Sequence, residues 1–401
     1  MLLMILYVLK IMLMIKITTY CLCLGMAVAL QAQQAERFSV ATLNIDGLPK
    51  KILVVNSNPD GPGGPGTVRI GNYFMKRGYD MMFMQEDFSY HGELAAVLED
   101  TYHLDTWSGT VGIDLPDKKI DFLHLQNLQF ECDGLMGAWK SGITVSGGQR
   151  TAWTDGFGKF SHAADLLVTK GFRRYEVTLA SGTAVVVYNL HMDAEAEEDT
   201  EEGKAGPDRA ARLNQWKQLR DAVMQSLDNR PVIILGDFNT FYFRDKVKET
   251  VIDDINASGK ATVKDAWVEL KNNGQYPAYE EDNRIRDNRE AEHKDEPLDK
   301  VLYINPAGAE KILRAASYER DTVTYKYDGK ALGDHYPVAV TFEVVNVNDP
   351  GPSGISSISS ATESEGTREY YNTSGQRVSN PTGGLYIERT GRQARKRIVK
   401  R

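Results

Sequence analysis

The 401-residue chain contains only three cysteines, at positions 21, 23 and 132. Cys21 and Cys23 lie in an apolar N-terminal segment that we expect to be removed, which leaves Cys132 alone. No disulfide can then form within the chain. A chain of this length can bury a full core without such cross-links. We therefore expect Cys132 to be a small buried apolar side chain rather than a reactive thiol.

Long apolar runs are also absent, except at the N-terminus. Residues 1–32 are almost wholly apolar, are broken by Lys10 and Lys16, and end in small residues. A basic start, an apolar stretch and a small-residue end are typical of a secretory signal peptide. The two lysines interrupt any 20-residue apolar span, which disfavours a retained membrane anchor. We predict a signal peptide over residues 1–32 and a secreted or cell-surface protein.

Positive charge is scarce in the body of the chain. Residues 33–345 carry 36 Lys and Arg against 50 Asp and Glu, a net charge of −14. Such a field repels polyanions. It disfavours a stable nucleic-acid partner, although a local basic groove could still bind one.

The composition changes after residue 346, where the predicted large domain of residues 33–346 ends. Residues 347–366 are rich in Ser, Pro and Gly, which predicts a flexible linker. Residues 367–401 hold two short strand-like stretches, at 370–378 and 383–387, and end in a basic run. This tail resembles the short C-terminal sorting modules of exported proteins in Bacteroidetes-type bacteria. We expect a monomer.

Strands alternate with helices in the body, which predicts an α/β fold. Residues 80–84 and 231–235 are continuous apolar runs, as in strands buried on both faces. Further strand-like runs occupy residues 37–43, 184–190, 298–304 and 338–345. Helical spacing predicts helices after Asp208 and over residues 93–98. Residues 56–67 are expected to form a Pro/Gly-rich loop, and residues 194–202 an acidic loop.

Polar residues stand at the ends of these predicted strands. They are Asn44, Glu86, His191, Asp237, Asn239, Asp334 and His335, and Asp299 stands at the start of the run 298–304. Ligands bind at the carboxyl ends of strands in open α/β sheets. A single Asp after a strand is often only a helix cap, but several strand ends together are hard to explain by capping. The pattern therefore predicts one functional site.

The residue types suit the hydrolysis of phosphate esters. Glu86 and Asn44 offer the hard oxygen ligands that Mg²⁺, or another divalent cation such as Mn²⁺, prefers. A metal ion held in this way can bridge a phosphate oxygen and neutralise developing charge.

Proton transfer can be assigned to the remaining polar residues. His335 can take a proton from water if a carboxylate, either Asp299 or Asp334, orients its ring. Asp237 and Asn239 are suited to place the water and bind a non-bridging oxygen. His191 can act as a general acid or stabilise the transition state.

Six short motifs carry a resemblance to a known family. They are Leu-Asn-Ile-Asp-Gly (43–47), Gln-Glu (85–86), Asn-Leu-His-Met-Asp-Ala (189–194), Gly-Asp-Phe-Asn (236–239), Leu-Asp-Lys-Val (298–301) and Gly-Asp-His-Tyr-Pro (333–337). In this order and approximate spacing, residues 38–344 resemble the endonuclease/exonuclease/phosphatase superfamily. The resemblance implies a four-layer α/β sandwich of two packed mixed sheets flanked by helices.

The resemblance also implies roles for individual residues. Glu86 matches the metal-binding acid, with Asn44 beside it, and Asp46 matches a position that only some members use near the metal. His335 matches the catalytic histidine and is paired with Asp299. The other catalytic positions match Asp237, Asn239 and His191. Members of the superfamily differ over whether the Asp237 or the His335 position is the base, and the sequence leaves both open.

Further residues resemble the neutral sphingomyelinases within this superfamily. Lys170-Gly171 resembles their Lys-Gly-hydrophobic signature, and residues 189–194 resemble their Thr-His-Leu-x-Ala segment, with Asn189 in place of Thr. Arg212, Gln215 and Leu219 resemble an Arg-x-x-Gln-Leu pattern that follows. The resemblance implies Mg²⁺-dependent hydrolysis of sphingomyelin to ceramide and phosphocholine at a membrane surface. Lys170 would contact phosphate or simply end a strand.

Three alternatives remain open on the sequence alone. The chain could be an exported nuclease or a phosphomonoester phosphatase of the same superfamily. A non-catalytic binding protein on the same fold would have lost metal or base residues, but all are present here. Trp153, Phe157, Phe160, Tyr242 and Phe243 are candidates for membrane contact, and core burial is the favoured reading of each.

Overall fold

The computed structural model describes the chain in segments. They are residues 36–52, 55–56, 58–109, 132–156, 168–194, 207–279 and 296–348, and in the tail 368–371, 377–378, 384–390 and 393–399. The chain divides into two compact units between residues 349 and 350. The predicted signal peptide, Phe157, Phe160, and most of the predicted linker and acidic loop lie outside the described residues.

Two six-stranded sheets form the larger unit. The first has the order β13 (Lys311–Arg320), β16 (Val338–Asn346), β1 (Arg37–Asn44), β4 (Met81–Gln85), β6 (Met136–Lys140) and β5 (Tyr102–Leu104). The second has the order β11 (Ala261–Asp265), β12 (Asp299–Pro306), β10 (Val232–Asp237), β9 (Ala184–His191), β8 (Gly171–Thr178) and β7 (Thr144–Ala152). The pairs β1–β4 and β9–β10 are parallel, and the other neighbours in these sheets pair antiparallel.

Alternate side chains of β1 pack into two different cores. Phe38 and Val40 join the core that includes residues of the second sheet. Ala41 and Leu43 point the other way and pack in a separate core with residues of the helix α2 (Gly63–Arg77). Since successive side chains of a strand alternate between its faces, the sheet is covered on both sides. This double burial explains why its strands read as near-continuous apolar runs.

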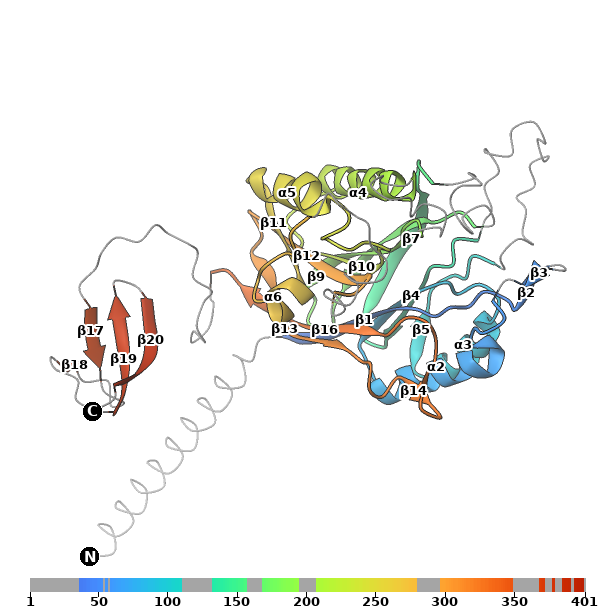
Figure 1. The fold of residues 1–401 in the computed structure, drawn as a ribbon, viewed down its shortest axis with the longest axis horizontal. Helices are drawn as coiled ribbons and strands as arrows, with labels where there is room; N and C mark the ends of the chain where they lie inside the picture. Colours follow the sequence, from blue (N-terminus) through green and yellow to red (C-terminus); the bar gives the residue numbers. More distant parts are fainter. Residues whose placement is uncertain are drawn as a thin grey trace, which may run out of the picture. The chain divides into compact units, whose positions relative to one another are not determined.

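Helices complete the outer layers, as Figure 1 shows. On the first sheet lie α2 and α3 (His91–Leu98); on the second lie α4 (Pro207–Gln225), the π-helical turn η4 (Lys248–Ile252) and α5 (Asp253–Ala257). The short helix α6 (Ala266–Lys271) packs beside β12 and β13. The arrangement confirms the predicted four-layer α/β sandwich.

One predicted loop is partly a helix. Residues 56–67 were expected to form a Pro/Gly-rich loop, but α2 begins at Gly63. Pro65 lies in the first helical turn, where a missing N–H costs nothing. Ile70 and Phe74 are fully buried against the first sheet, and this packing outweighs the weak helix propensity of the start. Gly78, with φ 63°, ends the helix and donates its N–H to Phe74 O.

The remaining differences between the predicted and the observed fold are short strands. Two minor hairpins pair β2 (Lys51–Ile52) with β3 (Val55–Asn56), and β14 (Lys326–Tyr327) with β15 (Lys330–Ala331). In the tail, the two expected strands are instead four: β17 (Arg368–Tyr371), β18 (Arg377–Val378), β19 (Gly384–Thr390) and β20 (Gln393–Val399). They form an antiparallel sheet in the order β18-β17-β19-β20.

Two further findings concern the chain as a whole. Within the described segments, no helix is long and apolar enough to cross a membrane. Cys132 is buried, and burial raises the pKa of its thiol to about 12, so the thiol stays protonated.

Candidate active site

Strand register brings the predicted site residues together. In the parallel pair β1–β4, Asn44 lies opposite Gln85, the residue before Glu86. In the second sheet, Asp237 of β10 lies between His191 of β9 and Asp299 of β12. Five strand ends therefore meet at one edge of the sandwich.

Three residues at this edge hold a left-handed backbone. Asp46 has φ 53°, Glu86 has φ 58° and Asn239 has φ 48°. This conformation costs a residue with a Cβ roughly 1–2 kcal/mol and is concentrated at functional sites. Hydrogen bonds hold it: Asp46 N–H donates to Asn44 Oδ1 (3.0 Å), Asn239 N–H to Asp237 Oδ1 (2.9 Å), and Phe88 N–H to Glu86 O (2.8 Å). All three residues closely follow the ends of β1, β4 and β10.

Close backbone approach explains two motif glycines. A Cβ on Gly47 would lie 2.2 Å from Glu86 O, and one on Gly236 would lie 2.0 Å from Leu190 O. Gly236 also has φ 142°, which L side chains rarely adopt. Neither position can carry a side chain unless the strand ends move apart.

Asp237 is the hub of the site. Its Oδ2 accepts a hydrogen bond from Asn44 Nδ2 (3.1 Å) and lies 3.4 Å from His191 Nε2 and 3.6 Å from His335 Nε2. Burial alone would raise the pKa of Asp237, but His335, His191 and the hydrogen bonds from Asn44 and Asn239 lower it. This carboxylate therefore stays ionised although it is fully buried.

His335 is oriented by Asp299, not by Asp334. His335 Nδ1 lies 2.8 Å from Asp299 Oδ2, which turns Nε2 towards Asp237. Burial alone would lower the pKa of His335, but Asp299 and Asp237 raise it well above its usual value. Asp334 was the alternative orienting residue; it is exposed and lines an adjacent pocket.

The opposite side of the site is crowded with carboxylates. Glu86 accepts a hydrogen bond from Asn44 Nδ2 (3.0 Å), and burial raises the pKa of Glu86. Burial, Asp334 and Glu86 together raise the pKa of Asp46 to about 7. Mutual repulsion of this kind is relieved by a bound cation, and oxygen donors suit Mg²⁺. The donor set of Glu86, with Asn44 and Asp46 beside it, therefore fits a divalent metal ion.

A second group of potential ligands is more tightly spaced. Ligand atoms of Asp237, Asp299 and His335 lie within 4.8 Å of one another. A metal ion between them would break the hydrogen bond from His335 to Asp299. One of its three ligands would also be a ring nitrogen, whereas Mg²⁺ prefers oxygen donors. The Glu86 side is therefore the better candidate for a metal position.

Lys170 and Asn189 lie at the same edge. Lys170 is buried, its Nζ donates to Met192 O (3.3 Å), and its charge lowers the pKa of Glu86 against the larger raising effect of burial. Asn189 replaces the Thr of the sphingomyelinase pattern and bridges the two sheets. It accepts from Gln85 Nε2 (2.7 Å) and donates to Met84 O and Met136 O (3.2 Å each).

Side chains of helix α4 form hydrogen bonds with the segment that follows His191. Asp193 N–H donates to Gln215 Oε1 (2.9 Å), and Arg212 Nη1 donates to Asp193 O (3.4 Å). Arg212 also forms a buried ion pair with Asp245 (Nε to Oδ2, 3.2 Å). The sequence pattern pointed to Arg212 and Gln215 but gave no sign of Asp245, whose partner lies 33 residues away.

Arg173 forms a second buried network that sequence reasoning missed. Its Nε and Nη2 donate to the two oxygens of Asp133 (2.8 Å each), and its Nη1 donates to Asp105 (2.7 Å). The neighbouring Gly134 O accepts the N–H of Asp87 (2.9 Å), directly after Glu86. The network thus fixes the backbone beside the acidic side of the site.

The aromatic residues proposed for membrane contact are buried where described. Trp153, Tyr242 and Phe243 are at most 4% exposed. Trp153 Nε1 donates to His191 O (2.7 Å) and so supports the end of β9. These three residues belong to the core, as favoured from the sequence.

Sequence comparison finds similarity to two mycobacterial enzymes. No family model matches the chain. It is 27% identical over 312 residues to proteins named sphingomyelinase from Mycobacterium bovis and Mycobacterium tuberculosis. The match covers 78% of this chain and 54% of those proteins, so the chain spans about half the length of these curated relatives.

Two solved structures align with about three quarters of this chain. An endonuclease/exonuclease/phosphatase from Bacteroides vulgatus aligns with a TM-score of 0.47 at 14% identity, over 77% of this chain and 99% of that one. A humanised TDP2 of D. rerio aligns with a TM-score of 0.46 at 15% identity, with the same coverage. The description of the fold rests on the strand order above.

Proposed function

We propose that this chain is a metal-dependent hydrolase of phosphoric esters. The observation that carries the proposal is the convergence on Asp237 of Asn44, His191 and His335, with Asp299 behind His335 and Glu86 within 3.9 Å of His191. Ionised carboxylates, oriented histidines and an oxygen-rich cation position in one place are what phosphate ester hydrolysis requires.

The acidic side would hold the metal ion. Glu86 is the principal ligand, while Asn44 and Asp46 shape the site around it. Bound Mg²⁺, or Mn²⁺, would neutralise charge that develops on the phosphate oxygens.

Proton transfer belongs to the other side of the site. Asp237 is the buried, ionised carboxylate, and it is placed to orient a water molecule and accept its proton. His335, whose protonated form is favoured by Asp299 and Asp237, donates from Nε2 to a phosphate oxygen. His191 and Asn239 supply further hydrogen bonds to the phosphate. In this assignment Asp237, not His335, is the base.

We propose sphingomyelin as the substrate, with ceramide and phosphocholine as products. The 27% identity to proteins named sphingomyelinase supports this choice, together with the buried Lys170 beside the acidic side of the site. The net charge of −14 over residues 33–345 favours a lipid over a polyanion. Secretion through the N-terminal signal peptide and a monomeric state are part of the same proposal.

A membrane surface is the proposed partner. Val323 and Tyr327 are 77% and 57% exposed, the highest among the large apolar side chains of the described segments. Both belong to the loop that carries β14 and β15 and leads to His335, and Lys326 and Lys330 flank Tyr327. Exposed apolar and basic side chains together suit a lipid interface.

The test is turnover on a panel of substrates. We expect the purified chain to release phosphocholine from sphingomyelin with Mg²⁺ and to stop when EDTA is added. Phosphatidylcholine, inositol phosphates and plasmid DNA are the comparison substrates. Cleavage of DNA without release of phosphocholine would refute the lipid assignment and make the chain a nuclease. Release of inorganic phosphate alone would make it a phosphomonoester phosphatase.

A further inference from the structure

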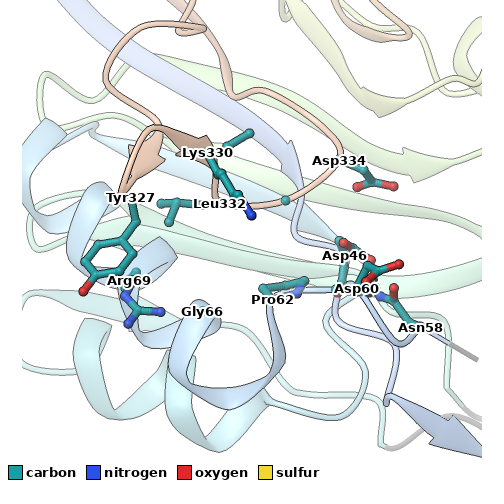
Figure 2. Close-up of a pocket in the computed structure, with 13 residues that line it drawn as sticks. Asp46, Asn58, Asp60, Pro62, Gly66, Arg69, Tyr327, Lys330, Leu332 and Asp334 are labelled. Carbon is teal, nitrogen blue, oxygen red and sulfur yellow. Dashed lines mark hydrogen bonds between the residues drawn. The ribbon is translucent and has the colours of Figure 1, made fainter.

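A pocket of about 470 Å³ opens beside the acidic side of the site. Asp46, Asp60 and Asp334 line one end, next to the proposed metal position. Helix α2 and the β14–β15 hairpin line the rest of the pocket with Arg69, Tyr327 and Lys330, and Figure 2 shows Lys330 between the acids and the Arg69–Tyr327 pair. The volume is that of a small-molecule site and exceeds what a single phosphate fills.

Two cations, Arg69 and Lys330, line this part of the pocket. The guanidinium carbon of Arg69 lies 3.8 Å from the centre of the Tyr327 ring. Within the described segments, neither Arg69 nor Lys330 forms an ion pair with a carboxylate. Lys330 is exposed and Arg69 is half-buried, so both can reach a ligand.

Stacking prepares Arg69 to bind an anion. The face of the Tyr327 ring fixes the plane of the Arg69 guanidinium and leaves its N–H edge open. A guanidinium in this geometry binds phosphate or carboxylate through two hydrogen bonds. Two unpaired cations are also unusual in a body of net charge −14, where carboxylates are abundant. A local positive potential at this end of the pocket is the consequence.

We propose that the pocket is a subsite for a second anionic group, with phosphate as the chemical type. A ligand with two phosphates would place the first at the catalytic centre and the second at Arg69 and Lys330. The acids at the near end disfavour an anion there, so the two phosphates are held apart. The inference rests on the proposed function only in placing the first phosphate at the Glu86 side.

This subsite goes beyond the proposed sphingomyelin activity. Sphingomyelin has one phosphate and a cationic headgroup, so it has no second anion to place in this subsite. Loss of both cations should therefore weaken only the binding of that second anion. Substrates or inhibitors with a second phosphate should lose affinity.

The experiment compares a bisphosphate with its monophosphate by calorimetry. Fructose 1,6-bisphosphate and fructose 6-phosphate are titrated into the Mg²⁺-loaded His335→Ala chain, in which turnover should be slowed. We expect the bisphosphate to bind about tenfold more tightly or better, which corresponds to about 1.4 kcal/mol. Adding Arg69→Gln and Lys330→Gln should abolish this preference and leave the monophosphate affinity unchanged.

Lys326→Gln is the matched control, because Lys326 is an exposed cation of the same hairpin that does not line the pocket. It should keep the preference for the bisphosphate. No preference in the starting chain, or equal loss in the control, would overturn the proposal.

Inorganic phosphate, titrated in the same way, distinguishes the source of the anion. A second phosphate site that the double variant loses identifies free phosphate as an occupant. A bisphosphate preference without such a site identifies a tethered group. Because these readouts are binding constants, they stand whether or not sphingomyelin is hydrolysed.

Discussion

The two sheets contribute different chemistry to the same edge. The first supplies Asn44, Asp46 and Glu86, an oxygen-rich and negatively charged group. The second supplies His191, Asp237 and Asp299, in which each carboxylate lies beside a histidine. In the proposed function this difference is a division of labour, in which the first sheet holds a cation and the second moves a proton. His335 enters from the loop before β16, a strand of the first sheet, and contacts residues of the second.

Replacement of His335 should have the largest effect. His335→Ala should lower kcat by about 10²–10⁴-fold, the usual contribution of a positioned acid or base. Metal affinity, measured by titration calorimetry, should stay within about threefold, because the first sheet is unchanged. Asp334→Asn should reduce kcat less than Asp299→Asn, since only Asp299 orients the ring. Turnover of His335→Ala at the wild-type rate would show that the role is misassigned.

Replacement of Glu86 tests the proposed metal position. Glu86→Gln should weaken Mg²⁺ or Mn²⁺ binding by about 100-fold or more, since even outer-shell partners contribute about 10–100-fold. Relief of carboxylate crowding should leave thermal stability unchanged or higher. Equal loss of metal affinity in Asp237→Asn and Glu86→Gln would break the proposed division and move the metal to the second group.

The ion pair between Arg212 and Asp245 lies on the side of the second sheet and should stabilise the fold in a pH-dependent way. Burial would raise the pKa of Asp245, but Arg212 and Arg244 lower it. Its contribution to stability is therefore complete above the ordinary aspartate pKa of about 3.9 and is lost as pH falls through the lower folded pKa. Asp245→Asn should cost about 2 kcal/mol at pH 7, and the difference should narrow below about pH 4. Urea unfolding across this pH range is the measurement. A difference that stays constant through acid pH would contradict the assignment.

Asn189 joins the two sheets and should give the smallest effect. Asn189→Thr restores the residue of the sphingomyelinase pattern. It removes the acceptor of Gln85 Nε2 and the donor to the carbonyls of Met84 and Met136. We expect a loss of about 1–2 kcal/mol in the free energy of unfolding. Unchanged stability would mean that the threonine hydroxyl replaces the amide, in which case the bridge between the sheets is not specific to asparagine.

Buried strands were the most predictable part of the fold. Residues 81–85 and 232–237 are covered on both faces, so their apolar runs marked both the strands and the polar residues at their ends. The edge strand β7 is largely exposed and rich in Gly, Ser and Thr, and it carries no such signal. Helix α2 was missed because its start has glycines and a proline, and only tertiary packing decides its structure.

The site was predictable where a motif fixes a strand end. The residue types alone left Asp299 and Asp334 as alternatives for orienting His335, and only the resemblance pointed to Asp299, because the choice depends on how the loop before β16 folds back. Arg173 with Asp133, and Arg212 with Asp245, pair across 40 and 33 residues and leave no periodic trace in the sequence. Such networks follow from the packing of loops, which no local pattern specifies.

The left-handed residues Asp46, Glu86 and Asn239 set a limit on how stable an active form of this chain can be. Glycine at each position would remove the backbone strain, and at Glu86 it would also remove a buried carboxylate. Selection for heat resistance alone would therefore tend to erase the side chains that the chemistry needs. Screens for hardier variants should monitor turnover as well as melting temperature, because these three positions offer stability at the expense of catalysis.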